Sequence, residues 1–135
     1  MMTLVLVSCG SSSVKTSEIK PLYEILTIQD DGGANIRFFE ILSESNEIAM
    51  LQNDEKLKNK LKPDDIKTSN FIVFNMGEKT AEGYKINIES AVETDKNIII
   101  TIKEITPESN TIGTQEIKMP YCIVKINSKK EIIIK

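Results

Sequence analysis

The stretch YKINIESAVETDKNIIITIKEI, residues 84–105, decides the fold. Its first part alternates apolar and polar side chains from Tyr84 onward, which is typical of a strand with one buried face. Residues 94–97, TDKN, have the composition of a hairpin loop, and residues 98–105 are rich enough in isoleucine for a central strand. We therefore predict two strands joined by a tight turn.

Similar short segments lie on both sides of this pair. The loop QDDGGAN joins the first two of them, and its acids and paired glycines favour a second hairpin. The chain then has seven or eight short strands at regular spacing, which favours an antiparallel sheet. The flanking segments are 22–28, 36–42 and 71–76 upstream, and 114–119, 121–126 and 131–135 downstream.

One helix is expected between the second and third of these segments. Residues 43–46, SESN, offer several N-caps, and acids precede lysines in the segment that follows, as the helix dipole prefers. Asn53 is a point where the helix could break, Pro63 ends it, and residues 64–70 form a polar turn. The apolar residues at roughly helical spacing are Ile48, Leu51, Leu57 and Leu61. The predicted fold is mainly β (α+β): an antiparallel β-sandwich or partly open barrel with one inserted helix.

The N-terminal residues differ in composition from the rest. A short apolar run is followed by Leu6-Val7-Ser8-Cys9, which resembles the lipobox of bacterial lipoprotein signal peptides. This resemblance implies that residues 1–8 are the remnant of a signal peptide and that Cys9 is lipidated. In the alternative interpretation the apolar run is a buried strand and Cys9 is a small core residue.

The same resemblance sets the expected domain layout. Residues 9–20 include the glycine-serine run GSSS and are expected to be a flexible tether. Residues 21–135 then form one β-rich domain, a length that can bury a core without disulfides. If Cys9 is acylated, Cys122 is left without a disulfide partner and is expected to be a buried apolar residue.

Charge and composition exclude several classes of function. The formal charge is −3, and the lysines are scattered among acids with a single arginine, Arg37, so we expect no nucleic-acid binding. The chain has no histidine, which removes the commonest general base and the commonest zinc ligand. We therefore expect no catalytic residues, no metal and no cofactor.

Two acidic doublets are the remaining candidates for chemistry. Asp30-Asp31 and Asp64-Asp65 could hold calcium or act as an acid and base pair. Both doublets lie at predicted turns, where aspartate commonly accepts hydrogen bonds from backbone amides. Capping of the backbone is therefore the favoured interpretation.

Two loops are candidates for a recognition surface. The glycines Gly77 and Gly83 are five residues apart between two strands, which does not fit a phosphate-binding loop. Together with Tyr84, Pro107 and Tyr121 they would form a binding surface if the 77–83 and 107–113 loops meet at one end of the sheets. The alternative is architectural: the glycines allow tight turns and the tyrosines belong to the core.

Residues 70–126 carry a family resemblance. They contain an apolar strand that ends in Gly77, a loop that ends in Gly83-Tyr84, a hairpin, the turn Glu104-Ile105-Thr106-Pro107, and Gln115 before Pro120. This pattern resembles the C-terminal domain of the protease complex subunit PrcB family. Upstream, Gly32-Gly33 and Asp65-Ile66 also resemble the longer form of that domain, so residues 21–135 are expected to be one PrcB C-terminal-like domain. The resemblance implies a lipoprotein or secreted accessory module, associated with a cell-surface protease complex and without catalytic residues of its own.

These observations favour a non-enzymatic extracytoplasmic lipoprotein that acts as a binding or accessory subunit. It would be anchored to a membrane of the bacterial cell envelope through Cys9, facing the periplasm or the exterior, with a protease or another envelope protein as partner. The alternatives are a structural envelope lipoprotein without a specific partner and a carboxylate-dependent enzyme.

Overall fold

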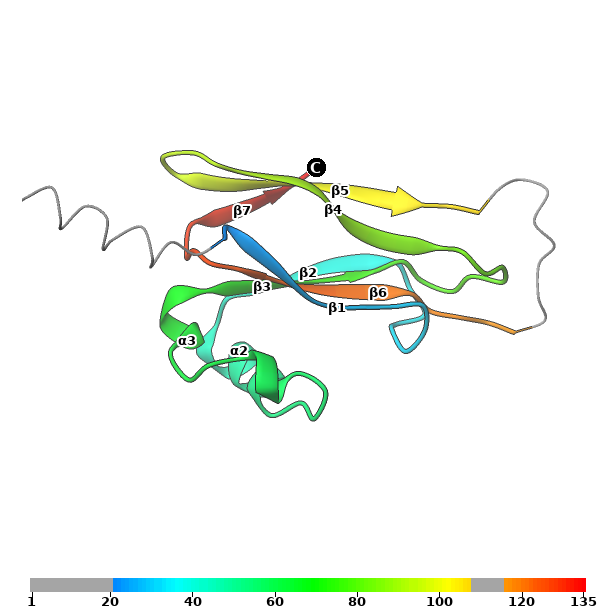
Figure 1. The fold of residues 1–135 in the computed structure, drawn as a ribbon, viewed down its shortest axis with the longest axis horizontal. Coiled ribbons are helices and arrows are strands. Elements are labelled where there is room, and N and C mark those ends of the chain that lie inside the picture. Colours follow the sequence, from blue (N-terminus) through cyan, green and yellow to red (C-terminus); the bar gives the residue numbers. More distant parts are fainter. Residues whose placement is uncertain (1–20, 108–115) are drawn as a thin grey trace, which may run out of the picture.

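The computed structural model describes residues 21–107 and 116–135, and within these ranges seven strands form two sheets. The two sheets pack face to face as separate layers, so the predicted mainly β sandwich is confirmed (Figure 1). The larger sheet has the order β1-β6-β3-β2 and the smaller sheet has the order β4-β5-β7. The strands are β1 Tyr23–Gln29, β2 Phe38–Leu42, β3 Asn70–Asn75, β4 Lys85–Glu93, β5 Asn97–Ile105, β6 Tyr121–Ile126 and β7 Glu131–Ile134.

Several predictions lie outside the described residues. These are the signal-peptide remnant 1–8, the tether 9–20 with Cys9, and most of the 107–113 loop.

The central hairpin is confirmed. β4 and β5 pair antiparallel from Lys85 opposite Ile105 to Glu93 opposite Ile98. The loop between them closes through a hydrogen bond of 2.8 Å that the Thr94 amide donates to the Asn97 carbonyl.

The second predicted hairpin is wrong. β1 and β2 do not pair with each other: β1 pairs antiparallel with β6, and β2 pairs antiparallel with β3. The central strands β3 and β6 pair with each other and are buried on both faces, so they need partners on either side. The glycine-containing loop after β1 therefore crosses from one edge of the sheet to the other.

One pair of strands departs from the predicted antiparallel arrangement. β7 runs parallel to β5, from Asn97 opposite Glu131 to Ile100 opposite Ile134. The chain leaves the larger sheet after β6 and joins the smaller sheet as β7 (Figure 1). Because the turn between them changes layers, β7 does not fold back on β6 as a hairpin.

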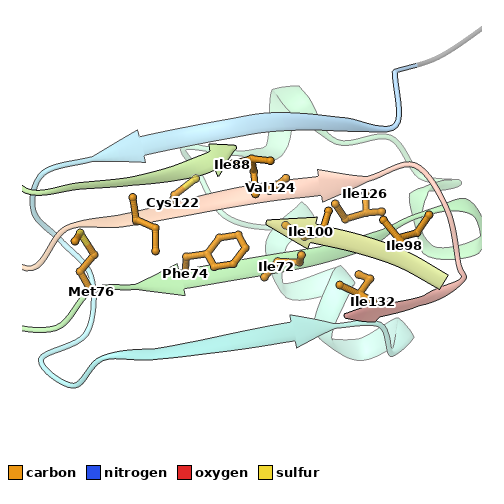
Figure 2. Packing of buried hydrophobic residues seen from close by; sticks show 11 residues of the cluster. Ile72, Phe74, Met76, Ile88, Ile98, Ile100, Cys122, Val124, Ile126 and Ile132 are labelled. Carbon is orange, nitrogen blue, oxygen red and sulfur yellow. The ribbon is translucent and has the colours of Figure 1, made fainter. Parts of the chain in front are cut away.

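The main core lies between the two sheets. Isoleucine, valine and phenylalanine side chains from both sheets meet in one apolar layer (Figure 2). Cys122 is a free, buried thiol in this layer, as predicted, and its burial raises the pKa of the thiol to about 12. The cluster consists of Ile72, Phe74, Met76, Ile86, Ile88, Ile98, Ile100, Cys122, Val124, Ile126 and Ile132.

A second apolar cluster lies on the outer face of the larger sheet. Short helices cover part of this face, on the side away from the smaller sheet (Figure 1). They are α2 Ser45–Gln52, the 3-10 turn η1 Lys58–Lys60 and α3 Asp65–Thr68. The cluster joins strand residues to the helical segment and consists of Leu26, Leu42, Ile48, Leu57, Phe71 and Ile123.

The prediction of one inserted helix is therefore only partly correct. α2 begins with a capping box, in which Glu47 accepts a hydrogen bond of 3.0 Å from the Glu44 amide, and it ends at Gln52, with Asn53 as its C-cap. The chain then turns at Asp54, whose carboxylate accepts a hydrogen bond from the Lys56 amide. The predicted polar turn 64–70 contains α3 instead. In the described part of the chain, no helix is long and apolar enough to span a membrane.

A buried ion pair fixes α3 to the larger sheet. Lys125 Nζ on β6 lies 3.0 Å from Asp65 Oδ1, and the two side chains are only 6% and 2% exposed. Asp65 Oδ2 also accepts a hydrogen bond of 2.8 Å from the Lys62 amide. The predicted capping role of Asp65 is thus confirmed, but its carboxylate is also buried and paired with a lysine, which the sequence did not indicate.

Candidate functional site

Gly83, Tyr84 and Pro107 lie together at one end of the sandwich. Gly83 has a φ of +100°, which favours glycine, and a Cβ atom placed there would lie 3.3 Å from Pro107 Cβ. Tyr84 comes just before β4, packs partly buried against the main core, and has Lys79 Nζ 5.0 Å from its ring centroid. The start of the 107–113 loop therefore does meet the 77–83 loop.

Lys118 connects three loops at the same end. Its backbone forms a two-way bridge with Lys79, with N–O distances of 2.8 and 2.9 Å. Its Nζ donates a hydrogen bond of 3.2 Å to Asp30 Oδ2 and lies 3.9 Å from Glu82 Oε1. The hydrogen bond to Asp30 raises the pKa of Lys118, and nearby carboxylates add to the effect.

Asp31, the neighbour of Asp30, accepts a hydrogen bond of 2.9 Å from the Met119 amide. This bond and a second one from the Gly32 amide lower the pKa of Asp31 below its ordinary value of 3.8. Asp30 therefore accepts a hydrogen bond from a lysine, and Asp31 accepts hydrogen bonds from backbone amides, as the capping interpretation predicts. Among the side chains that the structure describes, no three His, Cys, Asp or Glu residues gather as a metal-binding group.

Tyr121 lies on a different surface from Tyr84. Tyr121 packs against the outer cluster, whereas Tyr84 packs against the core between the sheets. A Cβ atom added at Gly32 would lie 3.4 Å from Tyr121 Cε1, so the loop after β1 passes close over the ring. The structure therefore brings Gly83, Tyr84 and Pro107 together, whereas Tyr121 packs against the other apolar cluster.

Tyr121 lines a groove with a volume of about 440 Å³. It is lined by residues of β1 and β6, by the loop after β1 and by the turn after α2. Apolar and charged groups both line it, as is common in binding pockets. The lining residues are Thr27, Gly32, Asp54, Glu55, Lys56, Leu57, Tyr121 and Ile123. Apart from Tyr121, these residues were not predicted as binding residues, because only the pairing of β1 with β6 brings them together.

Gly77 is needed where two backbone segments approach closely. Its φ is +85°, and a Cβ atom there would lie only 2.9 Å from the Arg37 backbone nitrogen. Beside it, the Glu78 amide donates a hydrogen bond of 3.2 Å to the Asn35 carbonyl. The loop after β3 therefore holds the residues that lead into β2. Here Arg37 pairs with Glu104 and lies 4.7 Å from the Phe39 ring centroid.

We expect Gly77→Ala to lower the free energy of unfolding by about 1–3 kcal/mol, because alanine is strained at positive φ and its methyl group would press on the Arg37 amide. Urea unfolding followed by circular dichroism measures this change. Glu78→Ala is the matched control, since this exposed side chain lies in the same loop, and it should change stability by less than about 0.5 kcal/mol. Equal unfolding midpoints for the two variants would contradict the close approach.

Comparison with known proteins identifies the central part of the chain. Residues 70–127 match the family model described as PrcB C-terminal. This part of the chain is similar to a PrcB C-terminal domain. The matched range contains the segment 70–126 that carries the motifs, whereas the expected domain of residues 21–135 is longer than the match. Neither the search of curated proteins nor the search of solved structures gave a match.

The PrcB C-terminal match covers β3, β4, β5 and β6. It includes all five predicted binding residues: Gly77, Gly83, Tyr84, Pro107 and Tyr121. The outer strands β1 and β2 and the helices lie outside the match, as does β7. The sandwich therefore consists of the matched segment together with strands that come before and after it in the sequence.

Proposed function

We propose that this protein is a non-enzymatic, lipid-anchored accessory subunit of a protease complex at the bacterial cell envelope. The single observation that carries the proposal is the PrcB C-terminal match over residues 70–127. The resemblance of residues 6–9 to a lipobox supports an anchor at Cys9, with residues 10–20 linking the anchor to the described domain.

The end of the sandwich where Gly83, Pro107 and Lys118 lie supports a role in binding. Its loops are held by the Lys79–Lys118 backbone bridge, by the Lys118–Asp30 ion pair and by the contact of Gly83 with Pro107. Loops fixed on a rigid scaffold commonly carry recognition. A surface that is already ordered loses little conformational entropy when it binds.

The test is a mild crosslinking pull-down of the tagged full chain from its native membrane fraction, read by mass spectrometry. We expect a protease in stoichiometric amount. Cys9→Ala is the matched variant for the anchor. It should abolish the incorporation of labelled fatty acid and move the protein out of the membrane fraction.

Two outcomes would contradict the proposal. Recovery of the membrane-bound protein with no enriched protease would favour a structural envelope lipoprotein. Membrane association that is unchanged in Cys9→Ala, with no fatty acid on the wild-type chain, would contradict lipidation.

A further inference from the structure

The strand β2 has a free edge. It pairs with β3 on one side, in an unbroken register from Phe38 opposite Asn75 to Leu42 opposite Phe71. On its other side, no strand or backbone hydrogen bond reaches it from residues 21–107 or 116–135. Figure 2 shows β2 as the outermost strand beside β3. Its outward amides and carbonyls are therefore available to a further strand.

The edge strands β1 and β4 are each interrupted in a way that discourages pairing. β1 has a register shift between Ile25 and Thr27, and its Leu26 carbonyl accepts a hydrogen bond of 2.6 Å from Lys60 Nζ. β4 has a register shift between Ile88 and Ser90. Bulges and lysines at an edge are common protections against unwanted strand addition.

The fourth edge strand, β7, has only four residues. Short edge strands are also a common protection. β2, by contrast, has no register shift, no proline and no lysine in its sequence FFEIL. It is therefore the edge of the described sandwich that is best suited to pairing.

The side chains along β2 also favour a partner. Phe38 is 41% exposed, and Ile41 and the preceding Ile36 are exposed as well. Glu40 lies in the middle of the strand, is exposed, and makes no ion pair with the described residues. An exposed apolar edge with one central carboxylate is complementary to an extended apolar segment that carries a cation.

We propose that β2 is a docking edge to which an extended segment of a partner protein adds as a strand, with Lys or Arg opposite Glu40. A second copy of this chain fits less well, since symmetric pairing about the middle of β2 would place Glu40 opposite Glu40. The inference rests on the proposed function, in which the partner is a subunit of the protease complex.

The test uses the full chain and two synthetic peptides, Ac-Val-Thr-Val-Lys-Val-Thr-Val-NH₂ and the same peptide with Glu in place of Lys. Both have symmetric sequences, so the central residue can face Glu40 in either strand direction. Hydrogen exchange measured by NMR should show slower exchange at β2 amides when the Lys peptide is added. The Lys peptide should bind about two- to fivefold more tightly than the Glu peptide, and Glu40→Lys should reverse this preference.

The control variant is Val92→Lys on the edge strand β4, where the side chain is 53% exposed. It should leave peptide binding unchanged. Protection elsewhere, no protection by either peptide, or the same preference in Glu40→Lys would overturn the proposal. A wild-type chain that sediments as a dimer through β2 without peptide would also overturn it and assign the edge to a second copy.

A further variant, Phe38→Lys on β2, separates this inference from the proposed function. If the pull-down recovers a protease equally well with wild type and with Phe38→Lys, the accessory role stands and the β2 edge is not the docking site. If no protease is recovered with wild type but the peptides show the charge preference, the edge is a binding surface for another partner.

Discussion

Replacing Asp65 by alanine is expected to lower the free energy of unfolding by about 3–5 kcal/mol. The change leaves the Lys125 ammonium buried without its carboxylate partner and removes the acceptor of the Lys62 amide. A loss of this size is a large part of the roughly 5–15 kcal/mol that stabilises a typical domain. Urea unfolding followed by circular dichroism measures it.

The neighbouring residue gives the control. Asp64 is exposed, and its side chain makes no capping hydrogen bond, so Asp64→Ala should change stability by less than about 0.5 kcal/mol. In the double variant Asp65→Leu with Lys125→Met, apolar groups replace both charges, and we expect most of the lost stability to return. If Asp65→Ala unfolds at the same urea concentration as Asp64→Ala, the ion pair contributes nothing to stability.

Phe74→Ala is expected to lower the free energy of unfolding by about 3–5 kcal/mol, because it leaves a cavity between the two sheets. Phe74 is fully buried on β3 and meets Phe39 of β2 edge to face, with ring centroids 5.1 Å apart. Thermal or urea unfolding measures the loss.

Val92→Ala is a suitable control for this second variant. Val92 lies on β4 but is more than half exposed, so its truncation should cost less than about 1 kcal/mol. Similar losses for Phe74→Ala and Val92→Ala would show that the layer between the sheets collapses around the missing ring.

The strands could be predicted from the sequence because their alternation and turn residues are local signals. The hairpin of β4 and β5 is the clearest case, since its loop closes between Thr94 and Asn97. Strand pairing over long distances is not a local signal. Nothing near Tyr23 indicates that it lies opposite Ile126, and the glycines of the loop after β1 equally suggest a hairpin.

In the candidate site too, local contacts could be predicted from the sequence and long-range contacts could not. The contact of Gly83 with Pro107 follows from the two ends of the β4–β5 hairpin, so the sequence could suggest it. The groove at Tyr121 depends on the pairing of β1 with β6 and on the turn after α2. The burial of Asp65 depends on Lys125, sixty residues later in the chain, and an acidic doublet after a proline gives no sign of it.

The pairing of β1 has a consequence for how fast the protein folds. β1 has a single strand partner, β6, and their registered residues lie about a hundred positions apart, as with Tyr23 and Ile126. Closing so long a loop costs entropy before any contact repays it, so sheets built from distant pairs commonly fold on the millisecond-to-second scale. During synthesis β1 cannot pair with β6 until nearly the whole chain has been made. Until then Leu26, which is buried in the folded protein, has no strand to pack against, and exposed apolar groups of this kind favour aggregation.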